Sequence, residues 1–244
     1  MQLGYEGLAL VGLIVVFAYT VVGTTGFGAS ITSVPLLVHL LPLTIVVPMM
    51  VVLDLCAGLL IVGRNFRAVD RRELLRLLPF MLAGVALGAT LLVSAPERLL
   101  LLGLGIAVLG YAAWSLLARP PSGHIAPWWS LPLGTVGGVF SALFGTGGPI
   151  YTIYFARRID DKGRLRATIS TLIFISALAR LAAFIAAGVY ARGELLLIAL
   201  MVPCMLLGLH VGSRLHHRLP ARQVIRIIWS LLLVSGSSLI WRSL

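Results

Sequence analysis

The chain carries little charge for its length. Only 11% of its 244 residues are Asp, Glu, Lys or Arg, while 59% are hydrophobic. About a quarter of the residues in a water-soluble domain are charged, so this composition excludes an ordinary soluble enzyme or binding module. Lipid is therefore the expected solvent for most of the side chains.

Cysteines and catalytic motifs are also scarce. Cys56 and Cys204 both lie inside apolar segments, which excludes a disulfide framework, and both are interpreted as packing residues. The sequence contains no Walker loop, dinucleotide fingerprint, nucleophile elbow or cluster at metal-ligand spacing. We therefore predict that the protein is not an enzyme and that it uses neither a cofactor nor a metal.

Several apolar runs reach the roughly 20 residues that a helix needs to cross a bilayer. They are 44–62, 75–95, 99–117, 167–189, 194–213 and 224–240. Lipid does not tolerate unpaired backbone amides, and these runs do not alternate as the strands of a barrel do. The sequence therefore predicts an all-α integral membrane protein.

The basic residues gather in some of the connections between these runs. Of the 19 Lys and Arg residues, 15 lie in segments 63–76, 118–124, 156–166 and 213–226. Basic connections stay on the cytoplasmic side of a membrane, so these segments are predicted to be cytoplasmic. The net charge of +11 thus reflects membrane topology and does not indicate a nucleic-acid partner.

Two glycine-rich clusters interrupt the apolar runs. The first extends from Gly23 to Ser30 and is followed by Pro35, and the second extends from Gly145 to Pro149. Glycine adopts unusual backbone angles and proline disrupts helices, so each cluster predicts a helix break with a new half-helix after it. Thr146 and Pro149 suit the start of the second half-helix.

A second correspondence joins two distant segments. Each segment has two glycines separated by three residues, then a proline and an arginine at the same spacing. They are Gly84, Gly88, Pro96 and Arg98 in one, and Gly208, Gly212, Pro220 and Arg222 in the other. We interpret the glycines as helix-packing residues.

These matches predict two related halves, 1–120 and 121–244, each with a broken or re-entrant hairpin and three spans. The loop near Pro96 is expected outside and its counterpart near Pro220 inside, so the repeats are predicted to be inverted. The second hairpin is too short for two comfortable spans and is predicted to be re-entrant. The first hairpin, about 6–41, is likewise predicted to dip in from outside, with a tilted full span of its long first arm as the alternative.

The glycine clusters are the predicted substrate site. In many secondary transporters, broken helices of inverted repeats meet at mid-membrane, and their N-termini attract anions. The alternative is that the glycines only permit tight packing. We favour a binding role because glycines, hydroxyls and a repeated position coincide. The predicted substrate-binding residues are Thr24, Thr25, Gly26, Phe27, Gly28, Ser30, Gly145, Thr146, Gly147 and Gly148.

Asp54 and Arg180 are the two charges inside predicted spans. Ionisable residues are rare within membranes and are functional hypotheses by default. The planar guanidinium of Arg180 suits an oxyanion substrate, and Asp54 is predicted to couple or gate transport. The alternative is a structural Asp54–Arg180 ion pair with no contact to substrate.

The pattern Gly26-Phe27-Gly28-Ala29 with Pro35, repeated in part as Gly145-Thr146-Gly147-Gly148, resembles the sulfite exporter TauE/SafE family of bacterial membrane permeases. The resemblance spans nearly the whole chain. It implies a multi-pass protein of the bacterial inner membrane that exports sulfite, organosulfonates or small carboxylates, with both glycine clusters lining the substrate path.

The leading hypothesis is a secondary transporter of small anions. Its partners would be the anion, a coupling proton or other ion, and the lipid bilayer, and the sequence leaves homo-oligomerisation open. A passive anion channel is the second hypothesis, because opposed re-entrant hairpins also build pores. A membrane enzyme subunit is the third, and it would need a cofactor or a catalytic constellation.

Overall fold

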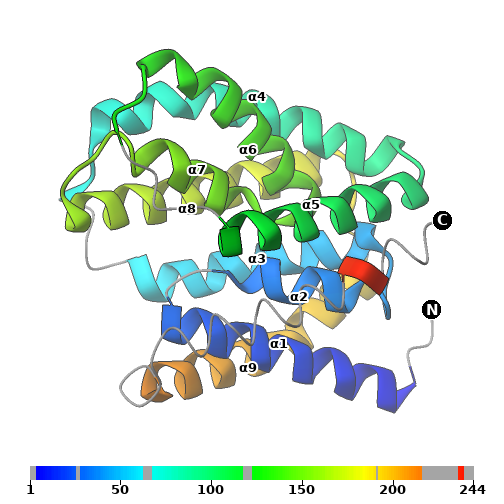
Figure 1. Ribbon diagram of the computed structural model, residues 1–244. Coiled ribbons are helices and arrows are strands. Elements are labelled where there is room, and N and C mark those ends of the chain that lie inside the picture. The colour runs from blue at the N-terminus through cyan, green and yellow to red at the C-terminus, as the bar shows by residue number, and fades with distance from the viewer. Residues whose placement is uncertain are drawn as a thin grey trace. The chain divides into compact units, whose positions relative to one another are not determined.

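The computed structural model describes residues 4–25, 28–62, 68–117, 123–190, 192–215 and 236–238. All regular structure within these ranges is helical, as predicted (Figure 1). The elements are α1 (Tyr5–Thr25), α2 (Ala29–Leu37), α3 (Leu43–Val62), α4 (Arg71–Ser94), α5 (Glu97–Leu117), the 3-10 helix η2 (Pro127–Trp129), α6 (Ser130–Phe144), α7 (Gly147–Phe155), α8 (Lys162–Ala186) and α9 (Arg192–Leu215).

Five of the described helices, α1, α3, α4, α8 and α9, are long and apolar enough to cross a membrane. The predicted spans 44–62, 75–95, 99–117, 167–189 and 194–213 correspond, to within a few residues, to α3, α4, α5, α8 and α9. Of the predicted span 224–240, only residues 236–238 are described. Pro220 and Arg222 also lie outside the described residues.

Both predicted helix breaks are confirmed. Helix α1 ends at Thr25, within the first glycine cluster, and α2 begins directly after Gly28, whose φ is 101°. Helix α6 ends at Phe144, and the next residue, Gly145, has a φ of 70°. Both angles lie in the left-handed region, which glycine adopts without steric cost.

The start of α7 differs in detail from the prediction. Thr146 occupies the N-cap position but makes no capping hydrogen bond with its side chain. Pro149 is the third residue of α7 and not the first, because the helix already begins at Gly147. Two backbone N–H groups, those of Gly147 and Gly148, therefore precede the proline at this helix end.

Helix lengths distinguish the two hairpins. Helices α2 and α7 have 9 residues each and α6 has 15. At 1.5 Å per residue these are about 14 Å and about 22 Å long, which is less than the roughly 30 Å of a hydrocarbon core. Helix α1, with 21 residues, is long enough for a full span. The lengths agree with a re-entrant second hairpin.

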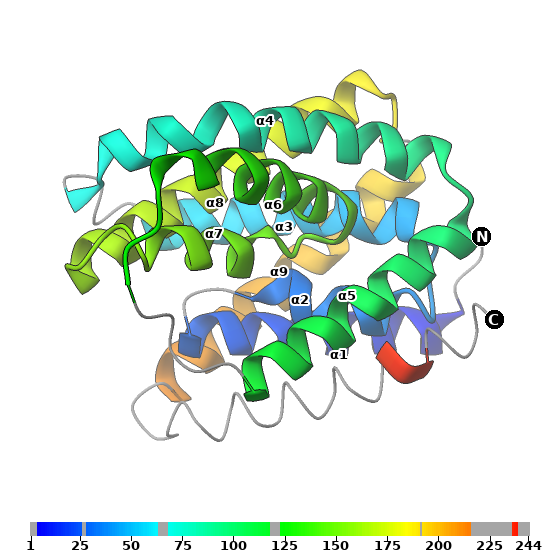
Figure 2. The same ribbon diagram turned by 45° about the horizontal axis from the view of Figure 1, so that its top comes forward.

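The helices form two compact units, and each unit draws on both halves of the sequence. Unit 1 consists of Met1–Leu53, Ala95–Leu117 and Tyr190–Leu244, and unit 2 of Asp54–Ser94 and Ala118–Val189. In unit 1, α9 lies along α1, and in unit 2, α4 lies along α6 (Figures 1 and 2). In both units, the helix with paired glycines contacts the first arm of the hairpin from the other half.

The paired glycines of α4 permit its close approach to α6. A β-carbon on Gly84 would collide with the carbonyl oxygen of Thr135, and one on Gly88 would lie 2.8 Å from that of Val139. These two carbonyls lie ten and six residues before Gly145.

The paired glycines of α9 approach α1 in the same way. A β-carbon on Gly208 would collide with the carbonyl oxygen of Val16, and one on Gly212 with that of Thr20. These carbonyls lie ten and six residues before Gly26. Helix α9 therefore packs on α1 in the same register in which α4 packs on α6. The predicted packing role of the glycines is confirmed.

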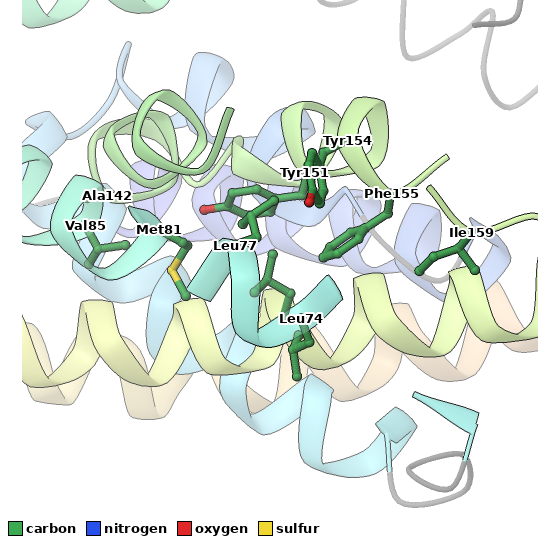
Figure 3. Close-up of a cluster of buried hydrophobic side chains, with 10 residues drawn as sticks. Leu74, Leu77, Met81, Val85, Ala142, Tyr151, Tyr154, Phe155 and Ile159 are labelled. Atoms are coloured by element: carbon green, nitrogen blue, oxygen red, sulfur yellow. The ribbon is translucent and has the colours of Figure 1, made fainter. Parts of the chain in front are cut away.

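A buried apolar cluster holds α7 in unit 2 (Figure 3). Its members from α4 are Leu74, Leu77, Met81 and Val85, and those from α6 and α7 are Ala142, Tyr151, Tyr154 and Phe155. The hydroxyls of Tyr151 and Tyr154 point in different directions within this cluster (Figure 3). Helix α7 thus presents two tyrosine hydroxyls to two different surroundings.

Candidate functional site

Arg180 lies beside the second helix break. The residue is on α8 and is only 2% exposed. Its Nη1 donates a hydrogen bond of 3.1 Å to the carbonyl oxygen of Ser141, and the backbone N–H of Gly145 donates one of 2.9 Å to the same oxygen. The structure therefore brings together two predicted parts of the site, Arg180 and the cluster that begins at Gly145.

Asp54, at the start of unit 2 on α3, is the charged partner of Arg180. Its Oδ2 lies 3.9 Å from Nη2 of Arg180. This distance is short enough for an ion pair but too long for a hydrogen bond. The two intramembrane charges thus pair, and their attraction offsets part of the cost of burying Arg180.

Three hydroxyls that the sequence analysis missed complete this region. The hydroxyls of Ser141 and Ser176 are both buried and are joined by a hydrogen bond of 2.8 Å. Tyr151 is fully buried, and Ser141, Ser176 and Arg180 are close enough to interact with its hydroxyl. We call these four residues, from α6, α7 and α8, the Arg180 cluster. Lone Ser and Tyr residues in apolar helices carry no sequence signal of such a cluster.

The first helix break has a different polar pattern. Three hydroxyls around it donate to carbonyl oxygens of their own helices: Thr24 to Val21 at 2.8 Å, Thr32 to Gly28 at 2.9 Å and Ser33 to Ala29 at 2.9 Å. Ser30 is buried on α2. Gly26, Phe27 and the side chain of Thr25 lie outside the described residues. The binding role of this cluster stays a prediction.

A second polar cluster, which we call the Glu73 network, joins the start of α4 to the end of α7. Glu73 is 5% exposed. Its Oε1 accepts hydrogen bonds from Arg76 (2.6 Å) and Arg158 (2.8 Å), and its Oε2 accepts one from Tyr154 (2.8 Å). The hydrogen bond from Glu73 raises the pKa of Arg158 above its ordinary value, so this guanidinium stays charged.

Asp70 supports the network from the residue before α4. Its Oδ1 accepts a hydrogen bond of 3.2 Å from the backbone N–H of Glu73, and its Oδ2 pairs with Arg164 at 3.0 Å. The spacing Asp-x-x-Glu is a sequence signature of a helix start and could have indicated this cap. Arg76 lies one helical turn after Glu73, whereas Arg158 and Arg164 come from distant segments that the local pattern does not indicate.

An arginine buried beside a helix break, among helices apolar enough to cross a bilayer, is typical of a membrane transporter. The sequence model of the family described as Sulfite exporter TauE/SafE matches residues 11–239. The chain therefore belongs to this family of multi-pass membrane transporters, as the resemblance implied.

One curated relative has a comparable length. The chain is 31% identical over 203 residues to the "Probable inner membrane transporter protein TsaS" of Comamonas testosteroni, which is 80% of this chain and 83% of the relative. No solved structure matches the chain.

Proposed function

We propose that the protein is a secondary transporter that exports small anions such as sulfite, organosulfonates or carboxylates across the bacterial inner membrane. The family description and the name of the relative support this class of activity. The observation that carries the proposal is the burial of Arg180 at the second helix break. A buried cation at such a break is suited to bind an oxyanion.

The N-terminus of α7 adds to the attraction for an anion. The N–H groups of Gly147 and Gly148 begin a helix of nine residues, and this end carries the positive pole of the helix dipole. Arg180 contacts the last turn of α6, just before the break, through the carbonyl oxygen of Ser141. A small oxyanion at this break would therefore meet both a full positive charge and a positive helix end.

Asp54 and the substrate compete for Arg180 in this proposal. The ion pair at 3.9 Å is loose, so an anion with better geometry can displace the carboxylate. Protonation of Asp54 would remove the competing charge and favour anion binding. Asp54 is thus the proposed proton-coupling residue, with Arg180 as the charged group that faces it.

We further propose that the two halves are inverted repeats. The matched register of α4 on α6 and of α9 on α1 supports the repeat relationship. Cysteines introduced at Ala95 and Leu219, after replacement of Cys56 and Cys204, should react with an impermeant reagent from opposite sides of the membrane. Labelling from the same side would contradict the inversion.

Transport is tested by counterflow of labelled sulfite into proteoliposomes. The wild type should show saturable uptake with counterflow, which a passive channel does not give. Arg180→Gln should abolish uptake, whereas Arg166→Gln, at an exposed position of the same helix, should retain it. Equal uptake by both variants, with both folded, would contradict the role of Arg180. Unsaturable flux in the wild type would favour the channel.

A further inference from the structure

We propose that Tyr151 determines specificity in this transporter, because its hydroxyl donates a hydrogen bond to an oxygen of the oxyanion bound at Arg180. The proposal rests on the proposed function. It adds a neutral hydrogen-bond donor, the Tyr151 hydroxyl, to the charged donor, the Arg180 guanidinium. The donor comes from α7, which also supplies the positive helix end.

The hydroxyl of Tyr151 is buried without a hydrogen-bond partner among the described residues. Tyr151 is 0% exposed, and its hydroxyl forms no hydrogen bond of acceptable geometry within the described part of the chain. Ser141 and Ser176 lie close to it but hydrogen-bond to each other at 2.8 Å. Buried hydroxyls are nearly always hydrogen-bonded, and an exception calls for a bound molecule or a role in function. A small oxyanion beside Arg180 would provide the acceptor.

The ring of Tyr151 is held in a fixed position by the hairpin. A β-carbon on Gly137 would collide with the Tyr151 ring on one edge, and one on Gly147 would lie 2.9 Å from the other edge. The two arms of the hairpin therefore hold the ring between two glycines. A donor that is fixed before the ligand arrives loses little conformational freedom on binding, which favours affinity.

Tyr154 differs from Tyr151 in the partner of its hydroxyl. This residue lies three positions later on α7 and is equally buried, but its hydroxyl donates to Glu73 at 2.8 Å. The hydroxyl of Tyr154 thus donates to a carboxylate of the protein, whereas that of Tyr151 lies beside Ser141, Ser176 and Arg180. The pair provides a matched experiment, because Tyr→Phe removes one oxygen at either position.

The test measures the affinity for sulfite and the melting temperature of the purified full-length variants. Tyr151→Phe should weaken sulfite binding by about 10- to 100-fold, the effect of one hydrogen bond to a charged group. Its melting temperature without anion should be equal to or above that of the wild type, because no protein hydrogen bond is lost. Tyr154→Phe should do the opposite, with a lower melting temperature and unchanged affinity.

The outcomes separate this inference from the proposed function. If Tyr151→Phe binds sulfite like the wild type while Arg180→Gln does not, a water molecule satisfies the hydroxyl and the inference is wrong. If neither variant changes the affinity, the proposed site is wrong as well. If Tyr151→Phe fails to fold, the affinity of Ser176→Ala for sulfite is measured instead. Weaker sulfite binding would support a cluster of hydroxyl donors beside Arg180, and unchanged binding would overturn the inference.

Discussion

The second helix break offers a sharp steric test in two adjacent residues, Gly147 and Gly148. A β-carbon on Gly147 would lie 2.6 Å from the carbonyl oxygen of Gly137 and 2.8 Å from the β-carbon of Ser141. A β-carbon on Gly148 would meet only the side chain of Ile173, at 3.3 Å. The first clash involves backbone that cannot move without opening the hairpin, whereas the second involves the flexible end of a side chain.

These distances give different expected stabilities. Forcing an extra carbon into a tight contact costs about 1–3 kcal/mol, so Gly147→Ala should destabilise the protein by about this amount. Gly148→Ala should be close to neutral, because the higher helix propensity of alanine, worth up to about 1 kcal/mol, offsets the small adjustment of Ile173. Gly147→Ala should also weaken sulfite binding, since it pushes against the ring of Tyr151.

The assay is thermal or denaturant unfolding of both variants in the same detergent, followed by sulfite titration. Equal stability of the two variants would refute the described geometry of the break. If Gly147→Ala is destabilised but binds sulfite with wild-type affinity, the packing of the hairpin does not affect sulfite binding. This result would contradict the role given to Tyr151.

Other substitutions test the remaining parts of the account. Gly84→Ala should lower the melting temperature, because its β-carbon would collide with α6, whereas Gly110→Ala, with nothing within 4 Å, should be neutral or slightly stabilising. Glu73→Gln should destabilise unit 2 by about 3 kcal/mol in chemical unfolding, since two arginines lose their charged partner, and an unchanged midpoint would contradict the network. Asp54→Asn should retain sulfite binding but lose the pH dependence of uptake, and an unaltered pH profile would exclude Asp54 as the coupling residue.

The helix breaks could be predicted because their cause is local. Glycines that adopt positive φ, such as Gly28 and Gly145, are visible in the sequence as dense clusters within apolar runs. Apolar length likewise predicted the long helices, since crossing a bilayer sets a minimum length. The pairing of Asp54 with Arg180 was predictable as an alternative, because buried charges in lipid rarely stand alone.

The composition of the site could not be predicted, because it depends on contacts between distant segments. Ser141, Tyr151 and Ser176 have no local feature that separates them from other polar residues in apolar helices. The partners of the paired glycines were equally hidden, since α4 packs on a helix from the other half of the chain. Only the tertiary structure joins Glu73 to Arg158.

The most direct test of the central claim is anion-dependent thermal stabilisation of the purified protein with sulfite, sulfoacetate, taurine, sulfate and small carboxylates. Binding to the folded state raises the melting temperature with ligand concentration. At least one of these compounds should stabilise the wild type and Arg166→Gln in a saturable manner and leave Arg180→Gln unaffected. Stabilisation of Arg180→Gln to the same extent, or of no variant by any anion, would contradict an anion site at the buried arginine.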